Sequence, residues 1–305
     1  MADRLKIAVL LGGPSAEREV SLRSGAAAAA AFRSLGHEVF EIDPIPGQLR
    51  LPPGLDAVFI ALHGTYGEDG AVQEELEKLG VPYTGCDVPS SRLAFDKVQT
   101  KAQLLKHGIP TPRSRVFTRP DAPWPSDWKP PVVIKPVRQG SSVGLRFVDA
   151  VEEFPAALAF ALQHDTEVLM EEKISGREST VGILGDKALP IVEIRPAKGV
   201  YDYHHKYTAG ATNYICPGEF SPDTTIAAQQ AALGAFSAIG GRDYARVDIM
   251  IASDGAPMVL EVNTLPGMTE TSLLPKAAAA AGLSFPALCQ AMIDLALKRT
   301  PRLTA

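Results

Sequence analysis

The chain has 305 residues, of which 46% are hydrophobic and 21% charged, a composition and length that fit a globular protein of two or three domains. Its formal net charge of −5 and the lack of a long single-sign run argue against a nucleic-acid binder, which depends on many phosphate contacts. The three cysteines are widely spaced and form no C-x-x-C pair, so neither a disulfide framework nor a zinc site is indicated.

The first apolar run, residues 7–11, ends in two glycines and is too short for a signal-peptide core or a membrane span. No other stretch reaches the ~18 apolar residues that a spanning helix needs. We therefore expect a cytoplasmic protein that has no membrane partner.

Strands and helices are expected to alternate at the N-terminus, in the pattern of a doubly wound parallel sheet. The predicted strands are residues 7–11, 38–43 and 57–62, and the predicted helices are residues 17–34 and 71–79. Ligands bind beyond the carboxyl ends of the strands in such sheets, where the glycine-rich loops 12–17 and 63–70 fall. We place the end of a first domain at residue 92.

A second unit is expected over residues 93–178. Asp96 is the predicted N-cap of a helix that runs to His107. After a proline-rich connector, a strand over residues 132–135 meets the loop R-Q-G-S-S-V-G, residues 138–144. Small residues would let the backbone N–H groups of this loop approach phosphate oxygens, although a plain hairpin turn is the alternative. Neither a Walker A loop nor a G-x-G-x-x-G fingerprint is present.

Lys135 ends the apolar strand that precedes this loop, and a buried ammonium group there requires an anionic partner. A triphosphate would suit it, and a local acidic side chain is the alternative. A further strand over residues 167–170 runs into the charged segment 171–178. That junction is either a place for an adenine between two domains or a solvated linker.

The last unit, residues 179–305, carries two short runs, Arg246-Val247-Asp248 and Glu261-Val262-Asn263, which a Ser-Asp-Gly turn at residues 253–255 would fold into an antiparallel hairpin. Alternate residues share a face, so one face would present three oxygen ligands and a guanidinium group. Such ligands suit Mg²⁺ shared with phosphate oxygens. The apolar neighbours predict strands buried on both faces. Solvated acidic side chains are the alternative.

A polar, aromatic stretch between residues 198 and 214 shows little regular patterning, which indicates either a lid or a disordered segment. The tyrosines and histidines crowded into it favour the lid. Two helices are expected to close the chain.

Taken in order, these motifs resemble the D-alanine–D-alanine ligases of the ATP-grasp superfamily, and they cover nearly the whole chain. The matching segments are L-L-G-G-P-S-A-E-R-E-V-S from Leu10, A-L-H-G-T-Y-G-E-D-G from Ala61, D-K from Asp96, V-I-K-P and G-S-S-V-G from Val133, Y-D-Y-H-H-K-Y from Tyr201, R-V-D-I-M from Arg246 and E-V-N-T-L-P-G-M-T from Glu261. The resemblance implies a three-domain α/β ATP-grasp fold, ATP between the central and C-terminal parts, and a homodimer.

The implied reaction joins two D-alanine molecules for peptidoglycan precursor synthesis, with ADP and phosphate released. ATP would first phosphorylate one carboxylate to an acyl phosphate, which the amine of the second D-alanine attacks. By the same resemblance, ATP binds to Lys97, Lys135, Glu171, Ile174 and Glu178. The metal ligands, for two Mg²⁺ or Mn²⁺ ions, are Asp248, Glu261 and Asn263.

The resemblance also assigns the D-alanine sites. The implied catalytic residues are Glu17, Ser141, Tyr207 and Arg246, and the implied substrate-binding residues are His63, Lys206, Gly267, Ser272 and Leu273. Lys173 departs from the family pattern, because many relatives carry an aromatic residue at this junction. An ester-forming ligase that uses D-lactate is one alternative, against which Tyr207 argues. A nucleotide-binding module without catalysis is another, against which the intact metal hairpin argues.

Overall fold

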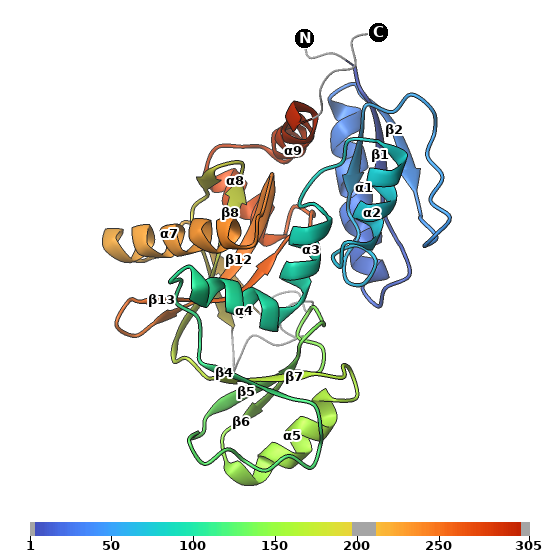
Figure 1. Cartoon of the computed structure of the whole chain (residues 1–305). Helices are drawn as coiled ribbons and strands as arrows, with labels where there is room; N and C mark the ends of the chain where they lie inside the picture. The colour runs from blue at the N-terminus through green and yellow to red at the C-terminus, as the bar shows by residue number, and fades with distance from the viewer. Residues whose placement is uncertain (1–3, 197–211, 300–305) are drawn as a thin grey trace.

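The computed structural model describes residues 4–196 and 212–299, which form three β-sheets with helices around them (Figure 1). One sheet is built from the N-terminal strands, one from the middle of the chain, and the largest from the C-terminal part. The predicted domain boundaries at residues 92 and 178 stay predictions, and β8 crosses the second of them.

The N-terminal sheet is parallel, with the strand order β2-β1-β3, as the alternating pattern predicts. Its core includes the edge-on contact of the Phe32 and Phe59 rings, whose centroids are 5.3 Å apart. The elements of this layer are β1 (Lys6–Leu10), α1 (Arg18–Ser34), β2 (Glu38–Ile42), β3 (Ala57–Ile60) and α2 (Ala71–Leu79).

Two short helices, α3 (Val88–Phe95) and α4 (Lys97–Lys106), lead out of this layer. The predicted cap of α4 is confirmed, because Asp96 accepts hydrogen bonds from the N–H groups of Val98 and Gln99, both at 3.0 Å. The cap fixes where the helix begins and so places Lys97 in its first turn.

The middle sheet is antiparallel, with the order β4-β7-β5-β6, and packs against the helix α5. Its small core centres on Phe154, whose ring meets Phe117 and Trp124, each at a centroid distance of 5.3 Å. The elements are β4 (Ser114–Phe117), β5 (Val132–Pro136), β6 (Arg146–Val148), a 3₁₀ turn (Val151–Glu153), α5 (Phe154–Ala161) and β7 (Val168–Glu172).

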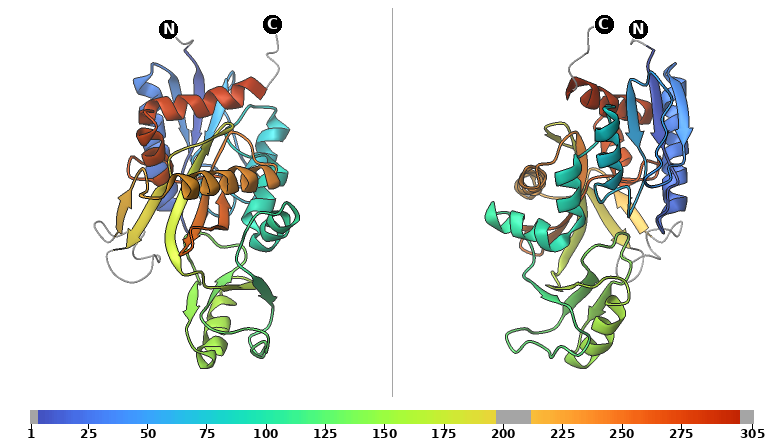
Figure 2. Two further views of the ribbon diagram at one scale, coloured as in Figure 1. Left: turned by 90° about the vertical axis from the view of Figure 1, so that its left-hand side faces the viewer. Right: turned by 45° about the vertical axis from the view of Figure 1, so that its right-hand side comes forward.

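The largest sheet has the order β11-β10-β8-β12-β13, with β9 also paired to β8. Helices α7 and α8 pack against it, α7 on β12 and β13 and α8 on β8 and β10 (Figure 2). On β8, Gly182 leaves room for α8, since a Cβ atom there would lie 2.6 Å from Leu274. The elements are β8 (Gly176–Leu184), β9 (Lys187–Ala188), β10 (Val192–Pro196), β11 (Thr212–Ile215), α7 (Pro222–Ala238), β12 (Tyr244–Ala252), β13 (Pro257–Asn263) and α8 (Leu273–Ala280).

The structure differs from the sequence predictions in several places. Helices α3, α5 and α7 were not expected. For α7 a local signal was present, because Ser221 and Pro222 are a helix-starting pair and the Ser221 hydroxyl accepts the Thr224 N–H. Residues 212–214 of the predicted lid belong to strand β11. The hairpin β12–β13 is not buried on both faces, because alternate residues of β12 are partly exposed.

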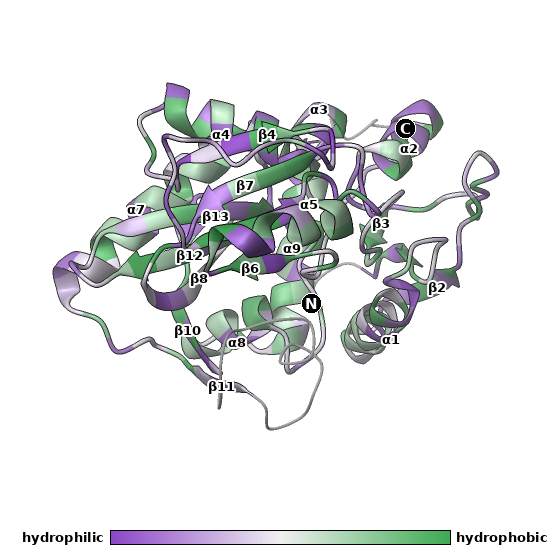
Figure 3. Ribbon diagram, turned by 90° about the horizontal axis from the view of Figure 1, so that it is seen from below, coloured by the Kyte–Doolittle hydropathy of each residue, from purple (hydrophilic) through white to green (hydrophobic). Residues whose placement is uncertain are grey.

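The last helix, α9 (Phe285–Arg299), packs against α1 and α8. Helices α1 and α7 lie at opposite sides of the molecule (Figure 3). Among the described residues, no single helix is long and apolar enough to cross a membrane; α8 and α9 pass such a test only as a pair bent by 102°.

A buried carboxylate joins the N-terminal layer to the largest sheet. The side chain of Asp243, just before β12, accepts the N–H of Gly85 at 2.9 Å and forms an ion pair with Arg299 of α9. Arg299 in turn donates to the carbonyl of Tyr83 at 2.7 Å. Asp243 has a φ of +65°, a region that Asp and Asn tolerate better than other side chains.

We expect Asp243→Asn to lower the free energy of unfolding by about 2 kcal/mol, because it removes the charge while keeping the backbone conformation and an acceptor for Gly85. Urea unfolding measures the loss. Asp294→Asn is the control, since Asp294 is exposed on α9 and bonds only to Gln290 within the described residues. Equal stability of the two variants would contradict this role.

Candidate active site

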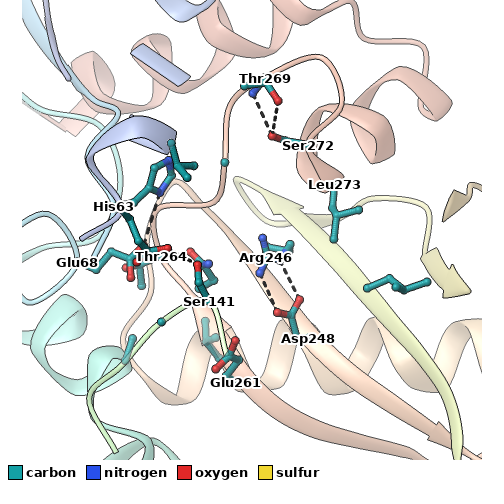
Figure 4. Close-up of a pocket in the computed structure, with 18 of the residues that line it drawn as sticks. His63, Glu68, Ser141, Arg246, Asp248, Glu261, Thr264, Thr269, Ser272 and Leu273 are labelled. Carbon is teal, nitrogen blue, oxygen red and sulfur yellow. Dashed lines mark hydrogen bonds and ion pairs between the residues drawn. The ribbon is translucent and has the colours of Figure 1, made fainter. Parts of the chain in front are cut away.

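A cavity of ≈ 710 Å³ opens where the three sheets approach one another. Figure 4 shows His63 and Glu68 on one side of it and Arg246 and Asp248 on the other. The cavity is lined by most of the residues singled out in the sequence: Glu17, His63, Lys97, Ser141, Glu178, Arg246, Asp248, Glu261, Asn263, Gly267, Ser272 and Leu273. The structure therefore brings together groups that are up to 256 positions apart in the chain (17 to 273).

Two carboxylates face each other across the hairpin, since Asp248 is the register partner of Glu261. Basic side chains accompany both. The guanidinium of Arg246 donates two hydrogen bonds of 2.8 Å to Asp248, and the Lys97 ammonium lies 3.7 Å from Glu261. Asn263 is opposite Arg246, and its side-chain oxygen accepts the N–H of Leu265 at 3.1 Å. The hairpin thus holds a concentrated, charge-balanced set of oxygen ligands.

The small-residue loop between β5 and β6 lies against the start of α1. The Ser141 hydroxyl donates a hydrogen bond to the Glu17 carboxylate, and a Cβ atom at Gly140 would lie 2.9 Å from that carboxylate. Ser141 and Ser142 both have positive φ values, +50° and +59°. Lys97 donates to the carbonyl of Gln139 at 2.7 Å. The loop is therefore held in a tight, strained conformation at the cavity.

Glu171 on β7 is buried between two ammonium groups. Its two carboxylate oxygens lie 2.7 Å from Lys101 and 2.5 Å from Lys135. All three side chains are buried, and Lys101 also donates to Thr111 at 2.7 Å. The alternative that the sequence left open for Lys135, a salt bridge with a local acidic side chain, is the arrangement seen here.

The charges of this triad offset one another only in part, because one carboxylate faces two ammonium groups. Burial alone would raise the pKa of Glu171, but the ammonium groups of Lys135 and Lys101 outweigh it and hold that pKa below its usual range. Burial lowers the pKa of Lys101 in spite of its pairing with Glu171. One carboxylate facing two lysines leaves positive charge next to the cavity, where an anion would be favoured.

Three serines of the N-terminal layer hold His63. The Ser15 hydroxyl donates a hydrogen bond to the His63 carbonyl at 2.6 Å, and the His63 N–H donates to the Ser21 hydroxyl at 2.9 Å. The His63 ring contacts the Ser24 hydroxyl. The other side of the ring faces Glu68, with Nδ1 3.7 Å from a carboxylate oxygen.

The segment after β13 carries a second group of predicted substrate residues. Ser272 is the N-cap residue of α8, and its hydroxyl accepts the N–H of Thr269 at 3.1 Å. A Cβ atom at position 267 would lie 2.9 Å from that hydroxyl, so glycine at this position lets the backbone pass close to the Ser272 side chain. Leu273 opens α8 beside it.

The remaining predicted residues lie elsewhere. Lys135, Glu171 and Ile174 do not line the cavity; the first two form the buried triad, and Ile174 is half-buried in the connection from β7 to β8. Lys206 and Tyr207, with most of the predicted lid, lie outside the described residues. Lys173 turns to Asp149, 3.1 Å away.

Several residues of the site were not predicted. Arg23, Glu68 and Lys276 line the cavity, and Lys101 completes the triad with Glu171. Glu68 lies in a loop that the sequence had marked as a ligand-binding edge, and Arg23 follows Glu17 on α1 by less than two helical turns. No local pattern marks Lys101, because its partner belongs to a strand about 70 residues away.

Within residues 4–196 and 212–299, no group of three or more His, Cys, Asp or Glu side chains is arranged to hold a metal ion. The hairpin supplies two carboxylates and an amide, so any ion there would need further oxygen ligands from water or a phosphate.

The chain matches two family descriptions, "D-ala D-ala ligase C-terminus" over residues 106–294 and "D-ala D-ala ligase N-terminus" over residues 46–86. It is 48% identical to the D-alanine–D-alanine ligase of Methylacidiphilum infernorum over 293 residues, which cover 96% of each chain. It is 45% identical to that of Moorella thermoacetica over 310 residues, covering 96% of this chain and all of the relative.

Solved structures similar to this chain are ligases as well. A D-alanine–D-alanine ligase from Bacillus anthracis in complex with ATP has a TM-score of 0.82 and 33% identity, covering 96% of this chain and 98% of that one. The VanG D-Ala:D-Ser ligase from Enterococcus faecalis has a TM-score of 0.82 and 30% identity, and the match covers 96% of this chain and 100% of that one.

The mixed α/β architecture is therefore the ATP-grasp fold of these ligases, as the sequence motifs predict. The chain belongs to the D-alanine–D-alanine ligase family.

We expect Glu171→Gln to destabilise the protein by about 3 kcal/mol at pH 7, because it leaves two buried ammonium groups without their counter-charge. The pKa of Glu171 is depressed in the folded chain, so its stabilisation is present above the usual carboxyl pKa of 4.5 and is lost as the pH falls below that value. The gap between the variant and the unchanged chain should therefore be constant from pH 7 to about pH 5 and shrink in urea unfolding curves recorded from there down to about pH 3. A gap that stays constant over the whole range would contradict the ion-pair explanation.

Proposed function

We propose that the chain joins two D-alanine molecules to D-alanyl-D-alanine with ATP, for peptidoglycan precursor synthesis. The observation that carries the proposal is the cavity, which places basic, acidic and hydroxyl groups from all three layers around one space. Relatives that match the chain over nearly its full length are named D-alanine–D-alanine ligases. Phosphoryl transfer needs little besides positioning and neutralisation of charge, which such a set of groups supplies.

The reaction proceeds in two steps. A carboxylate oxygen of the first D-alanine attacks the γ-phosphorus of ATP, which breaks the bond to ADP and forms an acyl phosphate. The amine of the second D-alanine then attacks the acyl carbon, and the tetrahedral intermediate loses a proton from nitrogen and expels phosphate. Both steps develop negative charge on oxygen, which cationic and N–H groups stabilise.

For ATP we propose the space between the middle and largest sheets. Lys97 and Lys135 would bind its phosphates, and Glu171, Ile174 and Glu178 its adenosine. The support is electrostatic, because Lys135 shares a single carboxylate with Lys101. A phosphate chain would compete with Glu171 and Glu261 for the two predicted lysines.

For the metal we propose Asp248, Glu261 and Asn263 as ligands of Mg²⁺ or Mn²⁺, with two ions in the full complex. The residues present fit such a group, since two facing carboxylates in a partly buried hairpin require cations, and in this structure Arg246 and Lys97 supply them. The ions would neutralise phosphate charge. Arg246, freed from part of its pairing, would then stabilise the transferring phosphoryl group and the tetrahedral oxyanion.

The first D-alanine is assigned to the side where Glu17 meets Ser141, with His63 close by, and the second to the segment that carries Gly267, Ser272 and Leu273. Glu17 would hold the ammonium group of the first substrate through its carboxylate. Lys206 and Tyr207 are assigned to the same substrates by the resemblance alone. The homodimer also rests on the resemblance alone, and the cytoplasmic location stays a prediction from the sequence.

The assay that tests this function measures phosphate release from ATP and Mg²⁺ with D-alanine, and identifies the product by mass. We expect release to require D-alanine and to yield the dipeptide, with L-alanine inactive. D-lactate or D-serine in place of the second D-alanine tests the alternative acceptors. Phosphate release without a dipeptide, or a product that contains D-lactate or D-serine in preference to D-alanine, would contradict the proposal.

The metal assignment predicts that Asp248→Asn raises the Mg²⁺ concentration needed for ADP binding by roughly tenfold or more, because one charged ligand is lost. Calorimetric titration of ADP at a series of Mg²⁺ concentrations measures this without reference to turnover. Asp254→Asn is the matched control on the same hairpin, since Asp254 is exposed in the turn. An unchanged Mg²⁺ requirement in Asp248→Asn would exclude this residue as a ligand.

A further inference from the structure

A single buried hydroxyl connects the two proposed D-alanine sites. Ser24, on α1, has no solvent exposure, and its oxygen lies 3.1 Å from Nε2 of His63. The same oxygen accepts the backbone N–H of Met268, also at 3.1 Å. His63 follows β3 in the N-terminal layer, whereas Met268 belongs to the segment that carries Gly267 and Ser272. Ser24 therefore connects the two chain segments that carry the proposed D-alanine sites.

The hydrogen bonds of Ser24 decide the proton position on His63. The Met268 N–H can only donate, so the Ser24 oxygen is its acceptor, and the hydroxyl hydrogen must find an acceptor of its own. In the part of the chain that the structure describes, the remaining hydrogen-bond partner of Ser24 is Nε2 of His63. A protonated Nε2 would leave the hydroxyl hydrogen unsatisfied at a site with no access to water, which is costly.

We propose that Ser24 is a positioning residue that holds His63 in the Nδ1-protonated tautomer. Nε2 then accepts the Ser24 hydroxyl, and Nδ1 carries the proton on the side of Glu68, whose carboxylate is 3.7 Å away. Ser15 and Ser21 fix the backbone of His63 on either side, so the ring orientation is determined as well. The neutral ring presents a hydrogen-bond donor, not a base, toward the acidic side of the cavity.

The tautomer has a consequence for the substrate, and this part rests on the proposed function. An N–H donor in the cavity suits an anionic oxygen, such as the carboxylate of the first D-alanine in place of the Glu68 carboxylate, whereas an unprotonated nitrogen would repel it. Because Ser24 also holds the Met268 N–H, its loss would loosen the segment assigned to the second D-alanine. Nucleotide binding, which uses other residues, should be unaffected.

The tautomer can be read directly by NMR in the full chain labelled with [¹⁵N]histidine, at a pH where the imidazoles are neutral. The sequence has six histidines, and the signals that disappear in His63→Gln assign His63. We expect a protonated Nδ1 and an unprotonated Nε2. A proton on Nε2 in the unchanged chain would overturn the proposal whatever the variants do and whether or not the chain is a ligase.

The variant Ser24→Ala provides a second, independent test of the proposal. We expect a shift of His63 toward the Nε2-protonated form, a rise of about tenfold in KM for D-alanine, and ADP affinity within about twofold of the unchanged chain. Ser34→Ala is the control, because it removes a hydroxyl from the same helix that donates only to Ala31 within the described residues and is exposed. An unaltered His63 spectrum in Ser24→Ala would overturn the tautomer role, and an unaltered KM would overturn the link to substrate.

Discussion

The constraint on which the site depends is the pairing of opposite charges in places with little access to water. Asp248 and Glu261 face each other across β12 and β13, and they are tolerated because Arg246 and Lys97 lie against them. One layer away, Glu171 is held between two lysines. Removing one partner of the buried Glu171 pairs leaves an uncompensated charge, which costs several kcal/mol. A charged ligand can replace one of these side chains as the counter-charge of its partner, so that no charge is left uncompensated.

This property explains how one cavity can accept an anionic nucleotide, divalent cations and zwitterionic amino acids in the proposed reaction. Each arriving charge would displace a protein partner of the same sign. The three-layer architecture makes the exchange possible: the N-terminal layer contributes Glu17 and His63 to the cavity, the middle layer the loop at Ser141, and the largest sheet the acidic hairpin. Enclosing the reaction between these layers would also keep water from an acyl phosphate.

Much of this arrangement could be predicted from local sequence. The hairpin β12–β13 is present with Gly255 of its predicted turn at a φ of +87°, and alternation along the strands correctly places Arg246 and Asp248 on one face. The parallel N-terminal sheet is also confirmed.

What could not be predicted depends on contacts between distant segments. In the sequence Lys101 is an ordinary helix residue, and its role follows only from its ion pair with Glu171 of β7. Ser24 is likewise one small residue in an alanine-rich helix, and its role follows from its contact with Met268. Helix α7 was missed because its apolar residues show no strong period: six of its 17 residues are alanine, and packing against the sheet determines its burial. Strand β11 was assigned to the lid, since its pairing with β10 is not visible in its composition.

In the proposed reaction the carboxylate of the first D-alanine is itself the nucleophile toward ATP. This can be measured with D-alanine labelled with ¹⁸O in both carboxylate oxygens, by mass analysis of the phosphate released with the dipeptide. Transfer through an acyl phosphate predicts that one ¹⁸O atom appears in each phosphate, because the oxygen that attacks phosphorus leaves with it. Phosphate that carries no ¹⁸O, formed together with the dipeptide, would contradict the claim.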